Sequence, residues 1–474
     1  MSKSKKIVIS LLGPALFFVC YFFLPESVFV TRQANAAVGT IVWMALWWIT
    51  GVVDFAVTAF LPIAINSLFQ ITDMSAVISN YASETILLLL GASILTASWE
   101  ETGLDRRIAA KFLSFVGSSA TNQIVFWYLL CAILSSILPN AVVCATMTPI
   151  AVSMLQYIGQ GDIKNSKFGS LLLLTIAYST GVGGLASPLG GAMNLVAVDY
   201  LEQVSGQEYM YVQWVIRFLP IMIVLVVSNI IMLLYSCRKC ESINLSKDYF
   251  KKQYSEMPKM TKVEIMSLTL FLVATALSFS RQFYQELLPG LKPAYVFIIC
   301  GILSFFITHK SGEPLMTWKS TQRRIVWDLM YVFAGGLALG TLINNSGVAK
   351  VLGGLVTGIN FEGDILLILV IVAFTVILSD ITSNTATAAV ALPIVISIAQ
   401  GLGRNPIPYI YIAIIGVNLS YMLPTSIRAI PVGYGLEPKY MLKKGLPITV
   451  VVIVLMSLIS YIMLRLWPAF STTV

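Results

Sequence analysis

The chain has 474 residues, of which 57% are hydrophobic and only 11% are charged, and its formal net charge is +8. Soluble domains carry about 25% charged residues, so this composition excludes a soluble globular protein. Apolar runs of nearly twenty residues recur along the chain, and each can cross a hydrocarbon core of ~30 Å. The strand alternation of a membrane barrel is absent. We therefore expect an all-α polytopic protein in the lipid bilayer.

The net positive charge does not indicate nucleic-acid binding, because the basic residues lie between the apolar runs, as membrane orientation requires. The motif "CRKC" at 237–240 has no second cysteine pair to complete a zinc site, so we expect no metal centre. The apolar run 7–24 is long for a signal peptide. We interpret it as the first span of a cell-membrane protein, with the N-terminus in the cytoplasm.

The second half of the chain repeats the first at a constant offset of 244 residues. The matching pairs are Gly91 and Gly335, Gly103 and Gly347, Asn140 and Asn384, and Pro149 and Pro393. Four matches at one offset over some sixty residues indicate an internal duplication, which is typical of secondary transporters.

Basic residues decide how the two repeats are oriented. The arm after the fourth predicted span carries three of them, whereas the equivalent arm at 344–358 carries only Lys350. By the positive-inside rule, the first arm lies inside and the second outside. This predicts an inverted repeat with about eleven transmembrane helices and two re-entrant hairpins that enter from opposite faces. The expected spans are 7–24, 36–52, 54–70, 79–98, 168–205 (broken), 213–235, 262–279, 290–308, 325–343, 408–436 (broken) and 446–467, and the hairpins are 121–157 and 364–399.

Polar, non-helical segments interrupt these apolar stretches at four places. The hairpin tips are residues 139–141 (the first tip) and 383–385 (the second tip), and the broken spans contain the loops 181–194 (the first loop) and 421–435 (the second loop). Non-helical backbone at membrane depth requires burial in protein or a wet cavity. We expect the four segments to converge, with helix N-termini that attract an anion. Helix capping alone is the alternative explanation for the polar second tip.

Several motifs resemble the divalent anion/sodium symporter family. They are "SNTATAAVALP" at 383–393, "ALWWIT" at 45–50, "TAFLPIAI" at 58–65 and Gly-Leu-x-Arg-Arg-Ile at 103–108. The resemblance implies an importer of di- and tricarboxylates, a homodimer and an elevator mechanism, in which a transport domain slides against a scaffold. The corresponding parts are 1–115 and 213–358 (scaffold), 116–212 and 359–445 (transport domain) and 446–474 (last span, with the C-terminus outside).

The resemblance also implies the substrate site. In the family, a Ser-Asn-Thr triplet at each tip holds a substrate carboxylate, and neighbouring backbone helps to hold sodium. This chain keeps the triplet only at the second tip, and an Asn of the family's second-loop pattern falls on Arg428. The substrate-binding residues carried over are Asn140, Ala141, Ser187, Pro188, Gly190, Ser383, Asn384, Thr385, Thr425, Ser426 and Arg428.

Arg428 leads to a hypothesis about coupling. An intramembrane Arg costs at least ~2.5–3.5 kcal/mol on insertion scales, and its planar fork fits a carboxylate. We hypothesise that it replaces a sodium ion, which favours sodium-independent exchange of C4 or C5 dicarboxylates such as succinate, malate or 2-oxoglutarate. Asp380 is the expected charge partner of Arg428. It forms a purely structural pair, positions Arg428 for substrate contact, or accepts a proton. The alternative is a sodium- or proton-coupled symporter of di- or tricarboxylates or sulfate, and no other cofactor is expected.

Other function classes lack their motifs. The single histidine, His309, lies in a predicted loop, and neither HExxH nor a P-loop sequence is present. We therefore expect no enzyme and no catalytic residue. A channel is the remaining alternative, and counterflow distinguishes a carrier from it.

Overall fold

The computed structural model describes residues 3–25, 31–115, 119–238, 248–309, 311–348, 351 and 363–473. In these ranges the chain is helical, and the only β-type pairing is an isolated bridge between Thr308 and Pro314. Eight described helices are long and apolar enough to cross a membrane. The predicted class, an all-α polytopic membrane protein, is confirmed.

The helices of the first half follow the predicted spans closely. They are α1 Lys3–Phe23, α2 Arg32–Thr50, α3 Phe55–Thr58, α4 Leu61–Phe69, α5 Met74–Ile78, α6 Glu84–Thr102, α7 Leu104–Leu113, α8 Ala120–Ile137, α9 Asn140–Tyr157, α10 Lys167–Gly184, α11 Ala192–Ser205 and α12 Tyr211–Cys237, with 3-10 turns η1 Ser79–Ala82 and η2 Pro188–Gly190. The predicted span 54–70 corresponds to one apolar helical stretch, Phe55–Phe69, which a turn at Ala59 and Phe60 divides into α3 and α4. Pro62 lies in the first turn of α4, where a proline without an N–H group is tolerated.

The second half has the corresponding series. Its elements are α13 Asp248–Glu256, α14 Lys262–Phe279, η3 Arg281–Phe283, α15 Pro293–Ser304, α16 Trp318–Thr321, α17 Trp327–Asn345, α19 Asp364–Ile381, α20 Asn384–Gly401, α21 Ile407–Asn418, η4 Ser426–Arg428, α22 Ala429–Gly433, α23 Pro438–Leu466 and η5 Pro468–Ser471. Lys350 and most of the arm at 344–358 lie outside the described residues, as does Cys240 of the "CRKC" motif.

The two helical hairpins have identical lengths at the predicted offset. Helices α8 and α19 begin and end 244 residues apart, and so do α9 and α20. In each hairpin only two residues separate the helices, Leu138-Pro139 and Thr382-Ser383. The four helices each have 18 residues, and the second helix of both hairpins contains the matching proline, Pro149 or Pro393. The duplication seen in the sequence is therefore also a duplication of structure.

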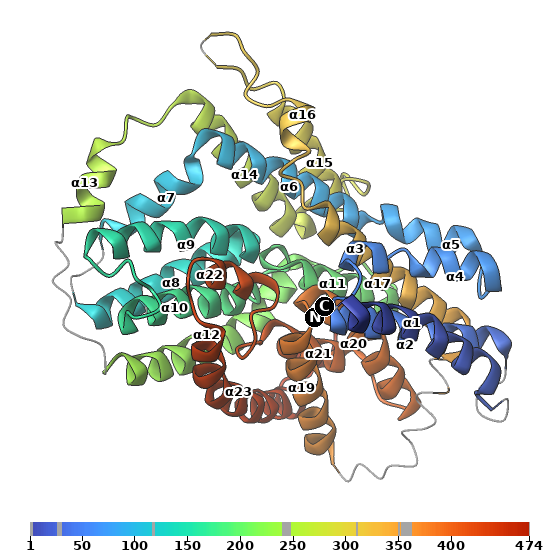
Figure 1. The fold of residues 1–474 in the computed structure, drawn as a ribbon. Helices are drawn as coiled ribbons and strands as arrows, with labels where there is room; N and C mark the ends of the chain where they lie inside the picture. The colour runs from blue at the N-terminus through green and yellow to red at the C-terminus, as the bar shows by residue number, and fades with distance from the viewer. Residues whose placement is uncertain are drawn as a thin grey trace.

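The packing is likewise repeated in the two halves. Helix α8 packs along α10, and α19 packs along α21, so each hairpin lies against the first helix of the broken span that follows it (Figure 1). A large core joins these elements to α6, α12, α14 and α15. A smaller core lies between α1, α2, α4 and α17, and it also receives Ala386 and Ala389 of α20.

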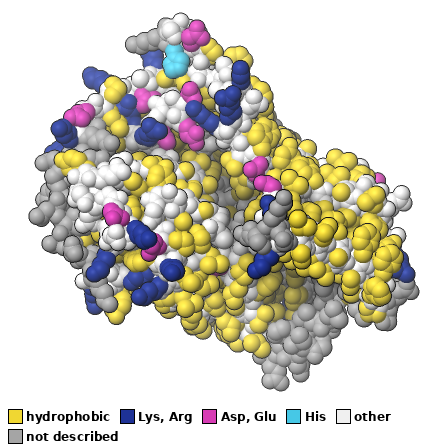
Figure 2. Space-filling model, viewed as in Figure 1, with side chains coloured by type: hydrophobic (Ala, Val, Ile, Leu, Met, Phe, Trp, Pro, Cys, Tyr) yellow, Lys and Arg dark blue, Asp and Glu magenta, His cyan; other side chains and the backbone are white. Residues whose placement is uncertain are grey.

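The surface separates charged from apolar side chains. Figure 2 shows Lys, Arg, Asp and Glu gathered at the upper left, near α7, α13 and α16, whereas apolar side chains cover much of the right, over α1 and α2. Many large apolar residues of the long helices are exposed, among them Ile133, Ile231 and Leu466. Such a surface is stable in hydrocarbon and is typical of a membrane protein.

Candidate functional site

The second tip is held by local hydrogen bonds. Ser383 precedes α20 and its Oγ accepts a hydrogen bond from the N–H of Ala386, 3.1 Å away. The hydroxyls of Thr382 and Thr387 lie 2.6 Å apart across the same turn. The capping expected from Ser383 is therefore present, and it leaves the neighbouring Asn384 side chain available for other contacts.

Asn384 binds the second loop. Its Oδ1 accepts hydrogen bonds from Arg428 Nη2 (2.9 Å) and Ser420 Oγ (3.3 Å). Arg428 closes the 3-10 turn η4, and only 1% of its surface is exposed. The Arg428 guanidinium also approaches Thr425 Oγ1 at 3.5 Å. The structure thus brings together three predicted site residues, Asn384, Thr425 and Arg428.

Two buried donors in this group have no hydrogen-bond partner among the described residues. They are Arg428 Nε and Asn384 Nδ2. A buried donor without a partner costs about 1–3 kcal/mol, and more when it is charged. A carboxylate accepts several hydrogen bonds through its two oxygens, so it can satisfy donors of this kind.

Asp380 holds the backbone of the second loop. Its Oδ1 accepts hydrogen bonds from the N–H groups of Tyr421 (2.9 Å), Met422 (2.8 Å) and Leu423 (3.4 Å), while its Oδ2 is buried without a partner in the described residues. No Asp380–Arg428 ion pair within 4.0 Å occurs in the described structure. The predicted charge partner is thus not a direct contact. Asp380 attracts the guanidinium electrostatically and positions the loop that carries it.

The first tip lies against the first loop. Asn140 begins α9 after Pro139, which provides no side-chain cap. A Cβ atom added to Gly184 or Gly191 would lie 3.4 or 3.6 Å from Asn140 Nδ2, so this amide faces a glycine-lined surface. Ser187 Oγ accepts a hydrogen bond from the Gly190 N–H at 3.1 Å. The predicted residues Ala141 (half-buried), Pro188 and Gly190 (both buried) lie in the same tip and loop.

Hydrogen bonds join the first-half and second-half segments. Asn418 Nδ2 donates to Asn194 Oδ1 (2.9 Å), and the Tyr178 hydroxyl donates to the Tyr421 carbonyl (2.7 Å). Cys144 Sγ lies 3.5 Å from the carbonyl oxygen of Ile427, next to Arg428. The tips and loops therefore form one connected region, as convergence requires.

Sequence reasoning missed several residues of this region. Asn194 is the last residue of the first loop, and Asn418 and Ser420 come just before the second loop. Polar residues at such places in apolar segments are the signal that would have found them. Two predicted site residues, Ser426 and Thr385, are not part of the hydrogen bonds around Asn384 and Arg428. Ser426 is exposed and has φ = 53°, which is rare outside glycine, and the buried Thr385 makes no side-chain hydrogen bond within the described region.

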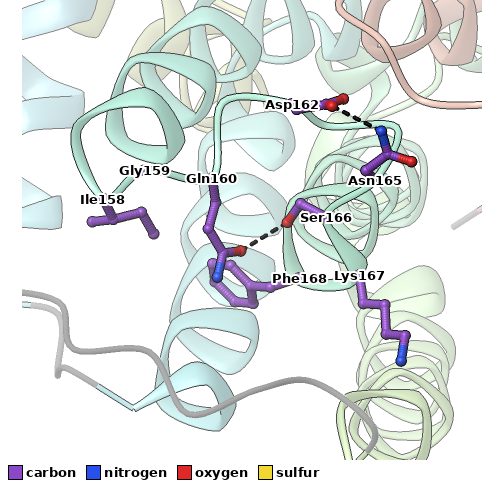
Figure 3. A pocket seen from close by; sticks show the side chains of 8 residues that line it. All are labelled: Ile158, Gly159, Gln160, Asp162, Asn165, Ser166, Lys167 and Phe168. Atoms are coloured by element: carbon purple, nitrogen blue, oxygen red, sulfur yellow. Dashed lines mark hydrogen bonds between the residues drawn. The ribbon is translucent and has the colours of Figure 1, made fainter.

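A cavity of about 440 Å³ lies away from the predicted site, at the loop between α9 and α10 (Figure 3). Gln160 Oε1 accepts a hydrogen bond from Ser166 Oγ (2.7 Å), and Asn165 Nδ2 donates to Asp162 Oδ2 (2.8 Å). No predicted substrate-binding residue lines this cavity. Since its polar groups bond to each other at an open surface, we assign it no role in substrate binding.

Paired helical hairpins, broken spans and a buried cation between two structural repeats define the class of secondary membrane transporters. Comparison with known proteins identifies the family. A model of the sodium:sulfate symporter transmembrane region matches residues 5–467, so the chain belongs to this family. The resemblance to divalent anion/sodium symporters is confirmed, and the protein is a transporter rather than an enzyme.

Two relatives are named sodium-dependent dicarboxylate transporter SdcS. The protein from Staphylococcus saprophyticus is 28% identical over 95% of this chain and 90% of its own length. The protein from Staphylococcus aureus is 29% identical over 97% of this chain and 93% of its own. The YdaH transporter of Alcanivorax borkumensis is similar in fold, with a TM-score of 0.55 and 11% identity over 83% of this chain and 88% of that one.

Proposed function

We propose that the chain exchanges one C4 or C5 dicarboxylate for another across the membrane without sodium. The observation that carries this proposal is the buried Arg428. Its Nε has no hydrogen-bond partner among the residues that the structure describes, and neither has Nδ2 of Asn384, whose Oδ1 binds Arg428. A substrate carboxylate would satisfy both donors. The names of the two Staphylococcus relatives support the substrate class.

The fixed charge has consequences for coupling. Arg428 is permanently protonated, so it provides a counter-charge that does not leave the protein. A carrier that needs no sodium to neutralise its substrate gains no energy from a sodium gradient. Its empty return would also move an unneutralised cation through a dehydrated barrier, which is costly. Both effects favour obligatory exchange.

The decisive test uses purified protein in proteoliposomes that contain succinate, 2-oxoglutarate or no substrate. We expect labelled succinate to enter loaded liposomes at the same rate with sodium or with choline outside, and to enter empty liposomes at least about tenfold more slowly, which corresponds to a barrier difference of about 1.4 kcal/mol. Uptake that requires sodium, or equal uptake into empty liposomes, contradicts exchange.

Two variants test whether sodium-independent exchange depends on the Arg428 guanidinium. We expect Arg428→Asn, which introduces the amide of the family pattern, to lose most sodium-independent exchange. Arg428→Lys keeps the charge but loses the planar fork, and we expect an intermediate rate. The sodium dependence of the unmodified protein answers the coupling question even if a variant does not fold.

Sodium-coupled symport is the second candidate function. The relatives' names favour it, and so does Asp380 Oδ2, a buried carboxylate oxygen without a partner among the described residues. Hard cations take oxygen ligands, and Thr425 Oγ1 is close by, 3.2 Å from the Asp380 carbonyl oxygen. Under this alternative the same assay gives sodium-dependent uptake into empty liposomes.

We further propose an elevator mechanism in a homodimer, as the family resemblance implies. The packing suggests which elements move together. Helix α12, assigned from the sequence to the scaffold, packs on α8 and α10, and α23 packs on α19. These contacts argue for placing α12 and α23 in the transport domain, together with the two hairpins.

A further inference from the structure

An apolar groove of about 390 Å³ runs along the outer side of the first hairpin. Its walls come from α6, α7, α8 and α14, and every lining side chain is aliphatic or aromatic. Ile133 of α8 and Leu272 of α14 are 58% and 51% exposed. The indole N–H of Trp99, the one polar group of the walls, already donates to the Ser267 carbonyl at 3.4 Å. The groove therefore offers contacts only to an apolar occupant.

The dimensions of the groove match one leaflet of a bilayer. The lining residues extend from Phe126 of α8 to Leu138, the residue that follows this helix, which is ~18 Å at 1.5 Å per residue. Half of a hydrocarbon core is roughly 15 Å. At Leu138 the groove adjoins a second hollow lined by Val142 and Val143 of α9, just behind the first tip. An acyl chain in the groove would thus reach the moving part of the site.

Two cations lie beside the groove. Lys111 is exposed and adjoins Phe112, a lining residue, and Lys262 is exposed at the start of α14. The Arg107–Glu264 ion pair, 2.6 Å long, joins α7 to the first turn of α14 and so brings the parts of the chain that carry the two lysines together. Neither lysine has an ion-pair partner in the described part of the chain. Each exposed lysine near a membrane surface attracts anionic headgroups.

We propose that this groove binds one acyl chain of an anionic phospholipid, with its headgroup at Lys111 and Lys262. The lipid fills the space between α8 of the hairpin and the helices α6, α7 and α14. The site is independent of the proposed substrate and coupling, because neither Arg428 nor any other residue assigned to substrate binding lines it.

The test measures lipid binding to the purified full-length protein by native mass spectrometry, with phosphatidylglycerol and phosphatidylcholine of identical chains. Each lysine near an anionic headgroup contributes about fivefold to binding, so we expect a preference for phosphatidylglycerol of about 25-fold. Lys111→Gln/Lys262→Gln should reduce the ratio to about one. The control Lys439→Gln/Lys443→Gln removes two exposed lysines of α23 and should retain it.

A second pair of variants tests the groove itself. Ile133→Trp places an indole in the path of the acyl chain and should abolish the retention of both lipids. Ile231→Trp places the same side chain at a 62% exposed position of α12 outside the groove and should change nothing. No preference in the unmodified protein, equal loss in variants and controls, or a loss of dimer mass in Ile133→Trp would overturn the proposal. The last result would instead show that a second copy of the chain covers the groove.

Discussion

Asp380 positions the second loop, the proposed substrate-binding loop, through a single carboxylate oxygen, and this gives a residue-scale prediction. Its Oδ1 accepts hydrogen bonds from the backbone N–H groups of Tyr421 and Met422. A hydrogen bond to a charged group contributes about 1.5–3 kcal/mol, so we expect Asp380→Ala to lower the free energy of unfolding by about 3 kcal/mol or more. Asp380→Asn keeps an oxygen acceptor and should cost clearly less. Denaturant unfolding of the detergent-solubilised protein measures both, and equal losses would contradict this positioning role.

At the scale of elements, close helix contact depends on glycine. Gly183 of α10 faces the backbone of Ala132 in α8, and a Cβ atom there would meet the Ala132 Cα at 2.5 Å. Membrane helices associate through such small residues, because lipid provides no hydrophobic drive between them. We expect Gly183→Ala to force α8 and α10 apart and to cost about 1–3 kcal/mol through overpacking.

A control for this prediction lies in α22. Gly433 has no atom within 4 Å of an added Cβ and no positive φ, so Gly433→Ala should leave the unfolding midpoint unchanged. Thermal unfolding monitored by tryptophan fluorescence distinguishes the two variants. An unchanged midpoint in Gly183→Ala would mean that the two helices separate without cost.

The helices and their duplication could be predicted because they depend on local sequence. Apolar run length sets the spans, and Pro139 and the Ser383 cap mark the hairpin breaks. The packing of α12 on α8 and α10 could not be predicted, because a face that packs on protein and a face that meets lipid are equally apolar. A single sequence therefore contains little information about which helices pack side by side.

The candidate site, too, could be predicted only in part. Asn384 and Arg428 could be selected because a polar tip and a buried cation are unusual at membrane depth. Their mutual hydrogen bond, and the Asn194–Asn418 bond between residues 224 positions apart, depend on tertiary packing. The same holds for Asp380. Its charge and position predict a partner of Arg428, but only tertiary packing shows that its Oδ1 accepts hydrogen bonds from three backbone N–H groups of the second loop, which are strong and obligatory donors.

At the scale of the whole molecule, the proposed elevator mechanism requires the first hairpin to slide past α7. Thr146 of α9 donates a hydrogen bond to Asp105 Oδ2 of α7 at 3.1 Å, so these two residues lie across the proposed sliding surface. In a cysteine-free background, oxidation of Asp105→Cys/Thr146→Cys should join the two parts and abolish dicarboxylate exchange, and reduction should restore it. Uptake into substrate-loaded proteoliposomes measures both states.

The matched control joins two elements that both lie in the proposed scaffold. Asn80 of η1 donates to Thr341 Oγ1 of α17 at the same distance, 3.1 Å. We expect Asn80→Cys/Thr341→Cys to cross-link without loss of exchange, because no relative motion is proposed between η1 and α17. If the cross-linked Asp105→Cys/Thr146→Cys protein also exchanges dicarboxylates at the control rate, the hairpin does not move against α7. The substrate would then have to reach both sides by local opening of the tips rather than by an elevator.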